Sequence, residues 1–259
     1  MYLILFFVFL QFVKKCNMRK YVILCFALTI AAFTACNSPK KVKTDSGSQS
    51  ADKTTTENNT NEDMTKVLLK TTMGDITIAL YNDTPGHKAN FEKLVEQKFY
   101  DGLLFHRIIK GFMIQGGDPD SKAAKAGQRL GSGDVGYTIP AEFRPNHYHK
   151  RGAVAAARMG DNVNPQKASS GCQFYIVDGT VCDDNYMNMI SQRTGKTFTP
   201  EQIAAYTTEG GAPFLDGDYT VFGEVVEGMD VVDRIAGQQK DGADRPLQDI
   251  SIISATILK

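Results

Sequence analysis

Hydrophobic positions in residues 64–259 fall into short runs separated by glycine, proline and polar residues. Two of these runs flank a turn at residues 73–75 and predict a β-hairpin over residues 67–80. Many short strands joined by tight turns predict a mainly β domain. The further strand-like runs cover residues 105–118, 152–157, 173–177, 219–225 and 250–258.

Two segments show helical spacing instead. Thr84 and Pro85 provide an N-cap and a first-turn proline, and Gly102 is expected to end this helix. A short amphipathic helix is predicted over residues 229–236, where Gly237 stops it. Strands in this order with two helices predict a closed antiparallel barrel capped by the helices, which leaves no strand edge exposed. The buried face of the first helix is expected to consist of Phe91, Leu94, Val95 and Phe99.

Residues 183–212 lie between two predicted strands and have the pattern of two helices. The second helix has Thr199 as its cap, followed by Pro200 and by Gln202 in the position of a capping box. We favour the interpretation of a surface insertion that packs on itself. The alternative is a rim that contacts a substrate or a partner.

The first 36 residues have the pattern of a targeting leader. Basic residues after Met18, an apolar run and small residues before Cys36 are typical of a secretory signal, and the cysteine gives a resemblance to bacterial lipoprotein signals. Cys36 would then be lipidated, although Phe33 departs from the usual Leu, Val or Ile. We interpret Met18 as the true start. A plain signal peptide, an uncleaved anchor and a helical hairpin are the alternatives.

Residues 37–63 are rich in Ser, Thr, Asn and Lys and have almost nothing apolar to bury. This composition predicts a disordered linker that tethers the domain to a membrane. Asn37 after Cys36 favours the outer membrane by analogy with other lipoproteins, with the domain facing the periplasm. A tethered monomer in the cell envelope is the default expectation.

Charge and cysteine content limit the classes of function and the kinds of site that the chain can have. The chain has 29 basic and 29 acidic residues, a balance that argues against a nucleic-acid binder. Of five cysteines, Cys172 and Cys182 fall in the domain. They could form a disulfide or stay as two separate thiols, and the sequence does not decide between these alternatives. His147 and His149 have no spacing typical of a metal site and are interpreted as loop histidines.

The most informative stretch is FHRIIKGFMIQGGD at residues 105–118. A hairpin there would bring Arg107, Met113 and Gln115 onto one surface, because side chains on strands alternate between faces. The same alternation puts Phe105 and Ile109 with Arg107, and His106 on the opposite face in a structural role. An apolar patch beside a strong donor suits an apolar ligand with a polarisable amide, such as an X-Pro peptide.

Together with GCQFYI at residues 171–176 and FLDGDYTVFGEV at residues 214–225, this stretch resembles the cyclophilin-type peptidyl-prolyl isomerases. The resemblance covers residues 66–258. It implies an eight-stranded antiparallel barrel capped by two helices, and a reaction that needs no metal or other cofactor.

The resemblance also implies roles for individual residues. Arg107 would be the catalytic arginine and Gln115 an active-site glutamine beside it. Tyr175 stands where Phe is usual, Phe214 where Trp often contacts cyclosporin, and Tyr219 where His is common. Cyclosporin binding should therefore be weaker than in members with Trp. The remaining substrate-binding positions are Phe112 and Met113 in the pocket, Ala157 and Arg158 beside the substrate backbone, Gln173, and Leu215 with Tyr175 on the pocket floor.

Two classes of function remain. The favoured one is an enzyme that isomerises X-Pro bonds in exported proteins, in which Arg107 donates to the nitrogen of the twisted amide. Since no bond forms and no proton moves, the lack of a nucleophile or metal signature fits this chemistry. The alternative is a binding module that captures proline-containing segments without important turnover.

Overall fold

The computed structural model describes residues 64–258. The predictions for the leader, for Met18 as the start, for Cys36 and for the linker 37–63 lie outside these residues. Within the described range, none of the helices combines the length and the apolar character needed to cross a membrane.

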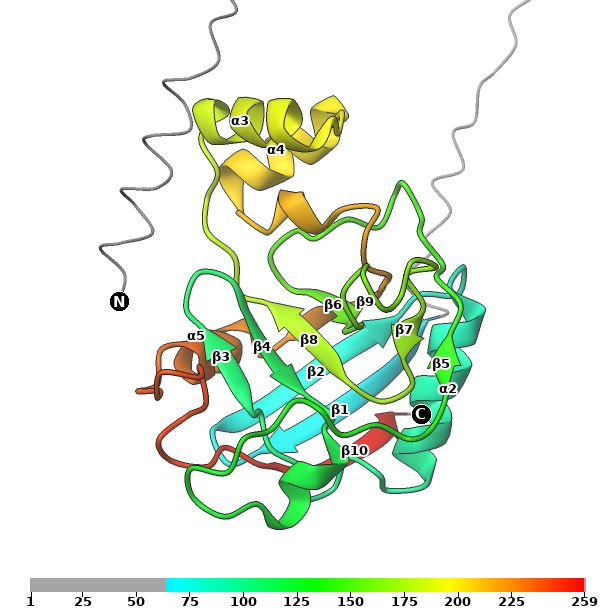
Figure 1. Ribbon diagram of the computed structural model, residues 1–259, viewed down its shortest axis with the longest axis vertical. Helices are drawn as coiled ribbons and strands as arrows, with labels where there is room; N and C mark the ends of the chain where they lie inside the picture. The colour runs from blue at the N-terminus through cyan, green and yellow to red at the C-terminus, as the bar shows by residue number, and fades with distance from the viewer. Residues whose placement is uncertain (1–63, 259) are drawn as a thin grey trace, which may run out of the picture. The chain divides into compact units, whose positions relative to one another are not determined.

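One antiparallel sheet of eight strands forms the body of the domain, in the order β10-β1-β2-β9-β6-β8-β4-β3 (Figure 1). The short strands β5 (Thr138–Ile139) and β7 (Ser169–Ser170) form a separate pair. The predicted mainly β architecture is therefore confirmed. The strands of the large sheet are β1 (Thr65–Thr71), β2 (Gly74–Leu80), β3 (Arg107–Ile109), β4 (Met113–Gly116), β6 (Ala153–Ala156), β8 (Phe174–Val177), β9 (Val221–Glu227) and β10 (Ile252–Leu258).

The two outer strands, β3 and β10, form no ladder with each other. Backbone hydrogen bonds instead join the segment before β3 to the start of β10. Gly102 N–H donates to Ile252 O at 2.7 Å, Ile252 N–H to Leu103 O at 2.8 Å, and Phe105 N–H to Ile250 O at 2.9 Å. The expected closed barrel is thus completed on this side by a loop bridge rather than by strand pairing.

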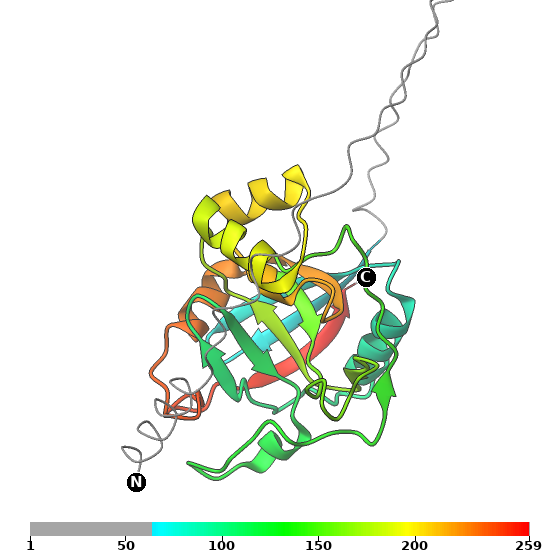
Figure 2. The ribbon, with the colours of Figure 1, turned by 45° about the horizontal axis from the view of Figure 1, so that its top comes forward.

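Helices α2 (Pro85–Glu96) and α5 (Met229–Ala236) lie at opposite sides of the sheet, as expected for the two capping helices (Figures 1 and 2). Helix α2 ends at Glu96 rather than near Gly102, because Lys98 adopts a left-handed backbone with φ +55°. Two short 3₁₀ turns are η1 (Pro119–Ala123) and η2 (Pro213–Leu215).

Thr84 occupies the N-cap position of α2, but its side chain does not cap the helix. The hydroxyl donates back to Tyr81 O at 3.3 Å. The carboxylate of Glu142 takes over the capping, accepting from Gly86 N–H at 3.0 Å and from His87 N–H at 2.9 Å. The free N–H groups at a helix start need such an acceptor, and here a distant loop supplies it.

The interior of the barrel is aromatic. Phe91 of α2 packs edge-on against Phe174 of β8, with ring centroids 5.4 Å apart, and Tyr100 packs against both rings. Because strand side chains alternate, Phe174 and Ile176 of β8 point into this core while Tyr175 and Val177 face a second apolar cluster. That second face of the sheet carries the candidate site.

The predicted insertion consists of α3 (Asp184–Thr194) and α4 (Pro200–Thr208), which lie together beyond β8 in Figures 1 and 2. The capping box of Thr199 and Gln202 is present as predicted. The two helices share a small core of their own with residues that flank them. Its members are Cys182, Met187 and Tyr206, with Tyr148, Tyr186 and Phe198 partly buried around them.

Candidate functional site

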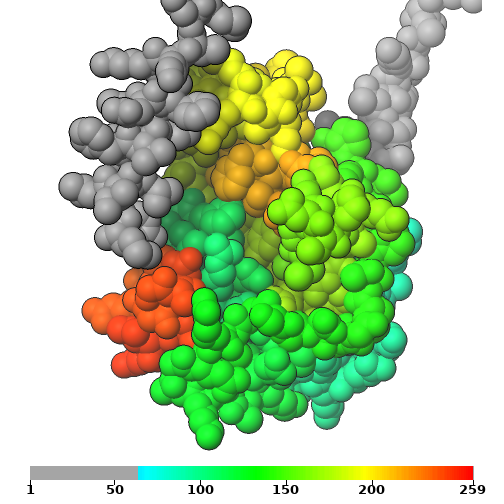
Figure 3. All heavy atoms as spheres, in the orientation of Figure 1, coloured from blue at the N-terminus to red at the C-terminus, as the bar shows by residue number. Residues whose placement is uncertain are grey.

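A cavity of about 490 Å³ opens on the outer face of the β3–β4 hairpin and β8. Figure 3 shows the surface hollowed between the orange segment near residue 215 and the green segment that contains residues 119–131. The predicted site residues that line it are Arg107, Phe112, Met113, Gln115, Ala157, Arg158, Tyr175, Leu215 and Tyr219.

The β3–β4 hairpin brings the polar part of the site together. Arg107 lies directly opposite Gln115, and Ile109 opposite Met113, across a turn in which Gly111 has φ +77°. One guanidinium N–H of Arg107 donates to Gln115 Oε1 at 3.4 Å. The predicted common surface of Arg107, Met113 and Gln115 is confirmed.

Gln115 is held in one orientation by Gln173, which is 7% exposed and does not line the cavity. The amide of Gln115 donates to Gln173 Oε1 at 3.0 Å. The amide nitrogen of Gln173 donates in turn to Gly133 O at 2.7 Å and Gly131 O at 3.2 Å. This chain of donors leaves Gln115 Oε1 as the acceptor that faces Arg107.

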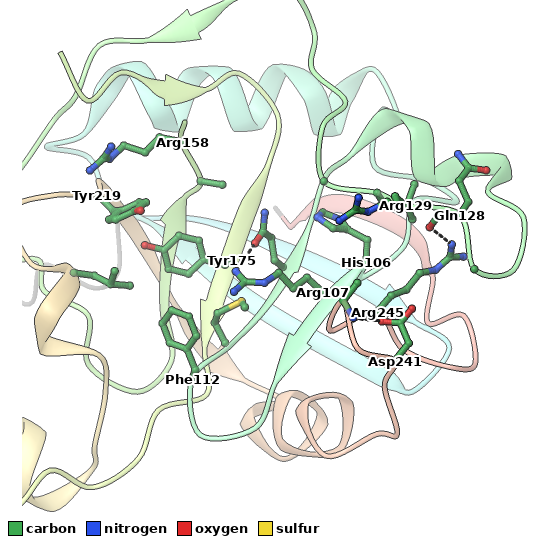
Figure 4. A pocket seen from close by; sticks show the side chains of 18 residues that line it. His106, Arg107, Phe112, Gln128, Arg129, Arg158, Tyr175, Tyr219, Asp241 and Arg245 are labelled. Atoms are coloured by element: carbon green, nitrogen blue, oxygen red, sulfur yellow. Dashed lines mark hydrogen bonds between the residues drawn. The ribbon is translucent and has the colours of Figure 1, made fainter. Parts of the chain in front are cut away.

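An apolar pocket adjoins Arg107. Met113, Tyr175 and Leu215 belong to one buried cluster, and Phe112 is partly buried against it. Figure 4 shows Phe112 and Tyr175 on the same side of Arg107. Phe214 does not line the cavity but lies behind Phe112, with ring centroids 5.4 Å apart. Phe214 therefore supports the pocket wall rather than forming it.

The hydroxyl of Tyr175 finds a buried partner. His149 Nε2 lies 3.0 Å from it, and His149 Nδ1 lies 2.8 Å from Asp216 Oδ1. Because a carboxylate faces Nδ1, that nitrogen carries the proton and Nε2 accepts from the hydroxyl. Tyr206 of α4 donates to the other carboxylate oxygen of Asp216 at 2.6 Å. We call Tyr175, His149, Asp216 and Tyr206 the pocket-floor network.

His149 lies in a loop, as interpreted, but its side chain is fully buried and has a structural role in this network that the sequence did not indicate. The insertion also does more than pack on itself, since Tyr206 reaches the network and Lys196 donates to Phe214 O at 2.7 Å. The only feature of the sequence that indicated such a network was the Tyr175 hydroxyl, which lies inside an apolar strand and needs a partner. Its partner lies 26 positions away, and no local pattern indicates the pairing.

The far wall of the pocket is formed by Arg158 and Tyr219. The guanidinium of Arg158 lies over the Tyr219 ring, 4.5 Å from its centroid, and its Nε–H donates to Asp218 O at 2.6 Å. Ala157, predicted to hold the substrate backbone, donates its N–H to Gln173 O and accepts from Ser170 N–H.

The prediction that side chains alternate between the two faces of the strand does not hold at His106. β3 begins only at Arg107, so the strand rule does not extend to the two residues before it. Phe105 turns into the core with Ile108, and His106 lines the cavity beside Arg107 instead of taking the opposite face. Burial lowers the pKa of His106 to about 4, so the imidazole is neutral near pH 7.

Cys172 and Cys182 are both free and buried, which answers the open question of a disulfide between them. No cluster of three or more His, Cys, Asp or Glu side chains suited to a metal ion occurs within residues 64–258.

Comparison with known proteins places this geometry in a family. The model of the family described as cyclophilin type peptidyl-prolyl cis-trans isomerase/CLD matches residues 66–257. The chain belongs to the cyclophilin-type isomerases. The resemblance predicted from three motifs is thereby confirmed, and so is the enzyme class.

Two curated relatives show how far the cyclophilin region extends. A putative peptidyl-prolyl cis-trans isomerase of Staphylococcus aureus is 35% identical over 193 residues, which cover 74% of this chain and 91% of that protein. A putative bifunctional phosphatase/peptidyl-prolyl cis-trans isomerase of Streptococcus pyogenes is 39% identical over 191 residues, or 72% of this chain. The matched region spans only 37% of the length of the Streptococcus protein.

Solved cyclophilins share the fold. A cyclophilin type isomerase of Cryptosporidium parvum has a TM-score of 0.56 and 24% identity, covering 76% of this chain and 98% of that one. A second structure of that protein, obtained in the presence of the dipeptide Ala-Pro, has a TM-score of 0.53 and 23% identity.

Proposed function

We propose that this cyclophilin accelerates rotation about X-Pro bonds by hydrogen bonding from Arg107 to the twisted prolyl amide. The observation that carries the proposal is the hairpin register, which puts Arg107 and Gln115 side by side at the edge of an apolar pocket. Such a pocket suits a proline ring, and the adjacent guanidinium suits the amide that precedes it.

The physical requirement is to bind the twisted amide more tightly than the planar one. Rotation breaks amide resonance and has a barrier of about 18–20 kcal/mol. The twisted proline nitrogen regains a lone pair, which a donor can stabilise only in that state. Arg107 keeps its charge at every relevant pH and offers several N–H groups, so it supplies this donor without a proton transfer.

The proposal is tested by exchange NMR on a proline-containing peptide with the full-length chain in detergent. Wild type should accelerate cis/trans exchange, and Arg107→Ala should lower kcat/KM by roughly 10- to 100-fold, because a charged hydrogen bond is lost from the transition state. Arg193→Ala, an exposed change on α3, serves as the matched control.

Near-normal turnover in a folded Arg107→Ala protein would contradict this mechanism. If wild type binds the peptide without accelerating exchange, the chain is a binding module with a cyclophilin fold. The insertion at residues 183–212 would then be the first place to search for its partner.

We also propose that the domain acts on exported proteins while anchored by lipid at Cys36 to the outer membrane, facing the periplasm. The signal-like leader and the polar segment 37–63 support this location. Metabolic labelling with an alkyne fatty acid should mark wild type but not Cys36→Ser, and the variant should leave the membrane fraction. Equal labelling of both proteins would reject Cys36 as the lipid site.

Weak cyclosporin binding and a monomeric state stay predictions.

A further inference from the structure

The cavity continues past Arg107, on the side away from Tyr175. Figure 4 shows Phe112, Tyr175, Tyr219 and Arg158 around one half, and Gln128, Arg129, Asp241 and Arg245 around the other, with Arg107 between the halves. The proline pocket accounts only for the first half. We call the second half the distal half.

His106 leaves hydrogen-bonding capacity unused in the distal half. The residue is 4% exposed, and neither ring nitrogen forms a hydrogen bond of normal geometry with the described residues, although the backbone of Leu104 interacts weakly with the ring. A buried polar group without a partner costs free energy, so such a group indicates a place where another molecule completes the bonding. The neutral imidazole can donate from one nitrogen and accept at the other.

Arg129 provides an uncommitted positive charge at the same place. It lines the cavity and is exposed, and its guanidinium forms no ion pair or hydrogen bond with any residue of the described range. This differs from Arg158 in the proline half, which is paired with Asp161 at 2.6 Å. A substrate anion would therefore meet a free cation in the distal half.

The loop that presents Arg129 is held in place by Arg245, which is 5% exposed. One guanidinium nitrogen of Arg245 donates to Lys125 O at 2.9 Å and to Gln128 O at 2.6 Å, and the other pairs with Asp249 at 2.9 Å. The backbone just before Arg129 is thus fixed by a buried clamp. Preorganisation of this kind lowers the entropic cost of binding.

Asp241 is the acidic side chain that lines the distal half, and one of its carboxylate oxygens already accepts hydrogen bonds from the backbone. Asp241 Oδ1 accepts from Ala243 N–H at 2.8 Å and from Arg245 N–H at 2.9 Å. Of the guanidinium groups that line this half, that of Arg245 pairs with Asp249 at 2.9 Å, and Arg107 Nε lies 3.6 Å from Asp244. Arg129 is therefore the lining cation that no carboxylate of the described residues pairs with.

We propose that the distal half is a subsite for an acidic side chain, Asp or Glu, that lies within a few residues of the substrate proline. The inference rests on the proposed isomerase function and names a substrate class for it. The carboxylate would pair with Arg129 and accept a hydrogen bond from His106, while the proline occupies the pocket across Arg107.

The test uses peptides with a single proline and Glu placed in turn at each of the three positions on either side, each matched by a Gln peptide. Exchange NMR gives kcat/KM, and fluorescence anisotropy gives Kd, for the full-length chain in detergent. At least one Glu peptide should have a kcat/KM about fivefold higher and a Kd about fivefold lower than its Gln partner, as expected for a partly exposed ion pair, and the preference should shrink in high salt.

Arg129→Gln should bring the Glu/Gln ratio close to one, whereas Arg193→Gln, the same charge change on an exposed face of α3, should keep it. His106→Leu should weaken the Glu peptide more than the Gln peptide, while a merely structural role would weaken both equally.

The subsite is overturned if no Glu peptide is preferred in either measurement, or if Arg129→Gln keeps the preference. These outcomes are distinct from failure of the isomerase function, in which even Gln peptides show no acceleration. Peptide affinities would still decide the subsite in that case.

Discussion

Arg107 lies beside the carboxylate of Asp244, which it shares with a second cation, Lys240. Its Nε is 3.6 Å from Asp244 Oδ2, but the other oxygen of Asp244 pairs with Lys240 at 2.6 Å. Shared in this way, Asp244 orients the guanidinium on one side while Gln115 orients it on the other. The remaining N–H groups of Arg107 stay available to the cavity.

His106 should make the stability of the domain depend on pH. Burial lowers its pKa to about 4, Asp118 and the backbone of Leu104 oppose this shift, and the charges of Arg107 and Arg245 add to it. Between pH 6.5 and 4 the unfolded chain binds a proton that the folded one does not, so stability rises with pH in this window. Acidification across it should lower the free energy of unfolding by up to about 3 kcal/mol through this residue.

Urea unfolding of wild type and His106→Leu at pH 7 and pH 4.5 measures this contribution. Burial also lowers the pKa of His87 and adds to the trend in both proteins, so the difference between them isolates His106. Identical pH dependence in wild type and variant would show that His106 is not buried in its neutral form.

At the scale of elements, α2 depends on an acceptor from another part of the chain. Burial alone would raise the pKa of Glu142, but hydrogen bonds from the side chain of His87 and from the backbone of His87 and Gly86 outweigh it and lower that pKa. The cap therefore works as a carboxylate. It connects the loop after β5 to the first turn of α2.

Glu142→Ala should destabilise the domain by about 2 kcal/mol, because two helix N–H groups and the His87 ring lose their acceptor. Glu92→Ala is the control, since Glu92 makes only a surface contact with Lys88 at 3.8 Å and should cost less than about 0.5 kcal/mol. Chemical denaturation measures both variants. Equal effects would mean that Glu142 contributes no more than a surface charge.

The pocket-floor network connects α4 to β8 and should behave as one unit. Tyr175→Phe and Tyr206→Phe should each cost about 1–2 kcal/mol, since each leaves a buried partner unpaired. The double variant should cost less than the sum, with a coupling of at least about 0.5 kcal/mol. Tyr148→Phe is the matched control, because the Tyr148 hydroxyl has no hydrogen bond within residues 64–258. Strict additivity would mean that the insertion and the pocket floor are independent.

The sequence predicted the elements whose signals are local. The hairpin at residues 67–80, the capping box at Thr199 and the alignment of Arg107 with Gln115 all follow from periodicity and turn residues within a short window. Thr84 has the same kind of local signal, yet a carboxylate 56 positions from Gly86 displaced it. Whether the helix N–H groups bond to a local side chain or to a distant one depends on the tertiary structure, which cannot be seen in a single sequence.

The same limit explains the parts of the site that were missed. The substrate-facing residues could be placed because their motifs are contiguous. His149, Asp216 and Tyr206 come from three separate segments, and each has an ordinary polar or aromatic identity on its own. Their connection depends on tertiary structure, since the loops that carry His149 and Asp216 link Tyr206 of α4 to Tyr175 of β8.

For the whole molecule, two cores of different size should open separately. Cys172 belongs to the large aromatic core, and Cys182 to the small cluster of the insertion. Burial raises the pKa of Cys172 to about 11 and also raises that of Cys182, so both thiols react only after opening. A smaller buried cluster opens at a lower free energy.

Single-thiol chains, made by replacing the other four cysteines with serine, should label at Cys182 at least about tenfold faster than at Cys172 under native conditions. Mass spectrometry after timed alkylation gives both rates. Equal rates that track global unfolding would show that the insertion and the barrel open together.

Strand β1 lies between β2, which follows it directly, and β10, with Lys66 opposite Leu258. As the chain leaves the ribosome, β1 and β2 can pair at once, but the other edge of β1 stays open until residues 252–258 have been made. An unpaired strand edge is a template for pairing with other chains. This cyclophilin therefore completes its own sheet only after residues 252–258 have been synthesised, and until then it is itself a nascent chain that needs protection from aggregation.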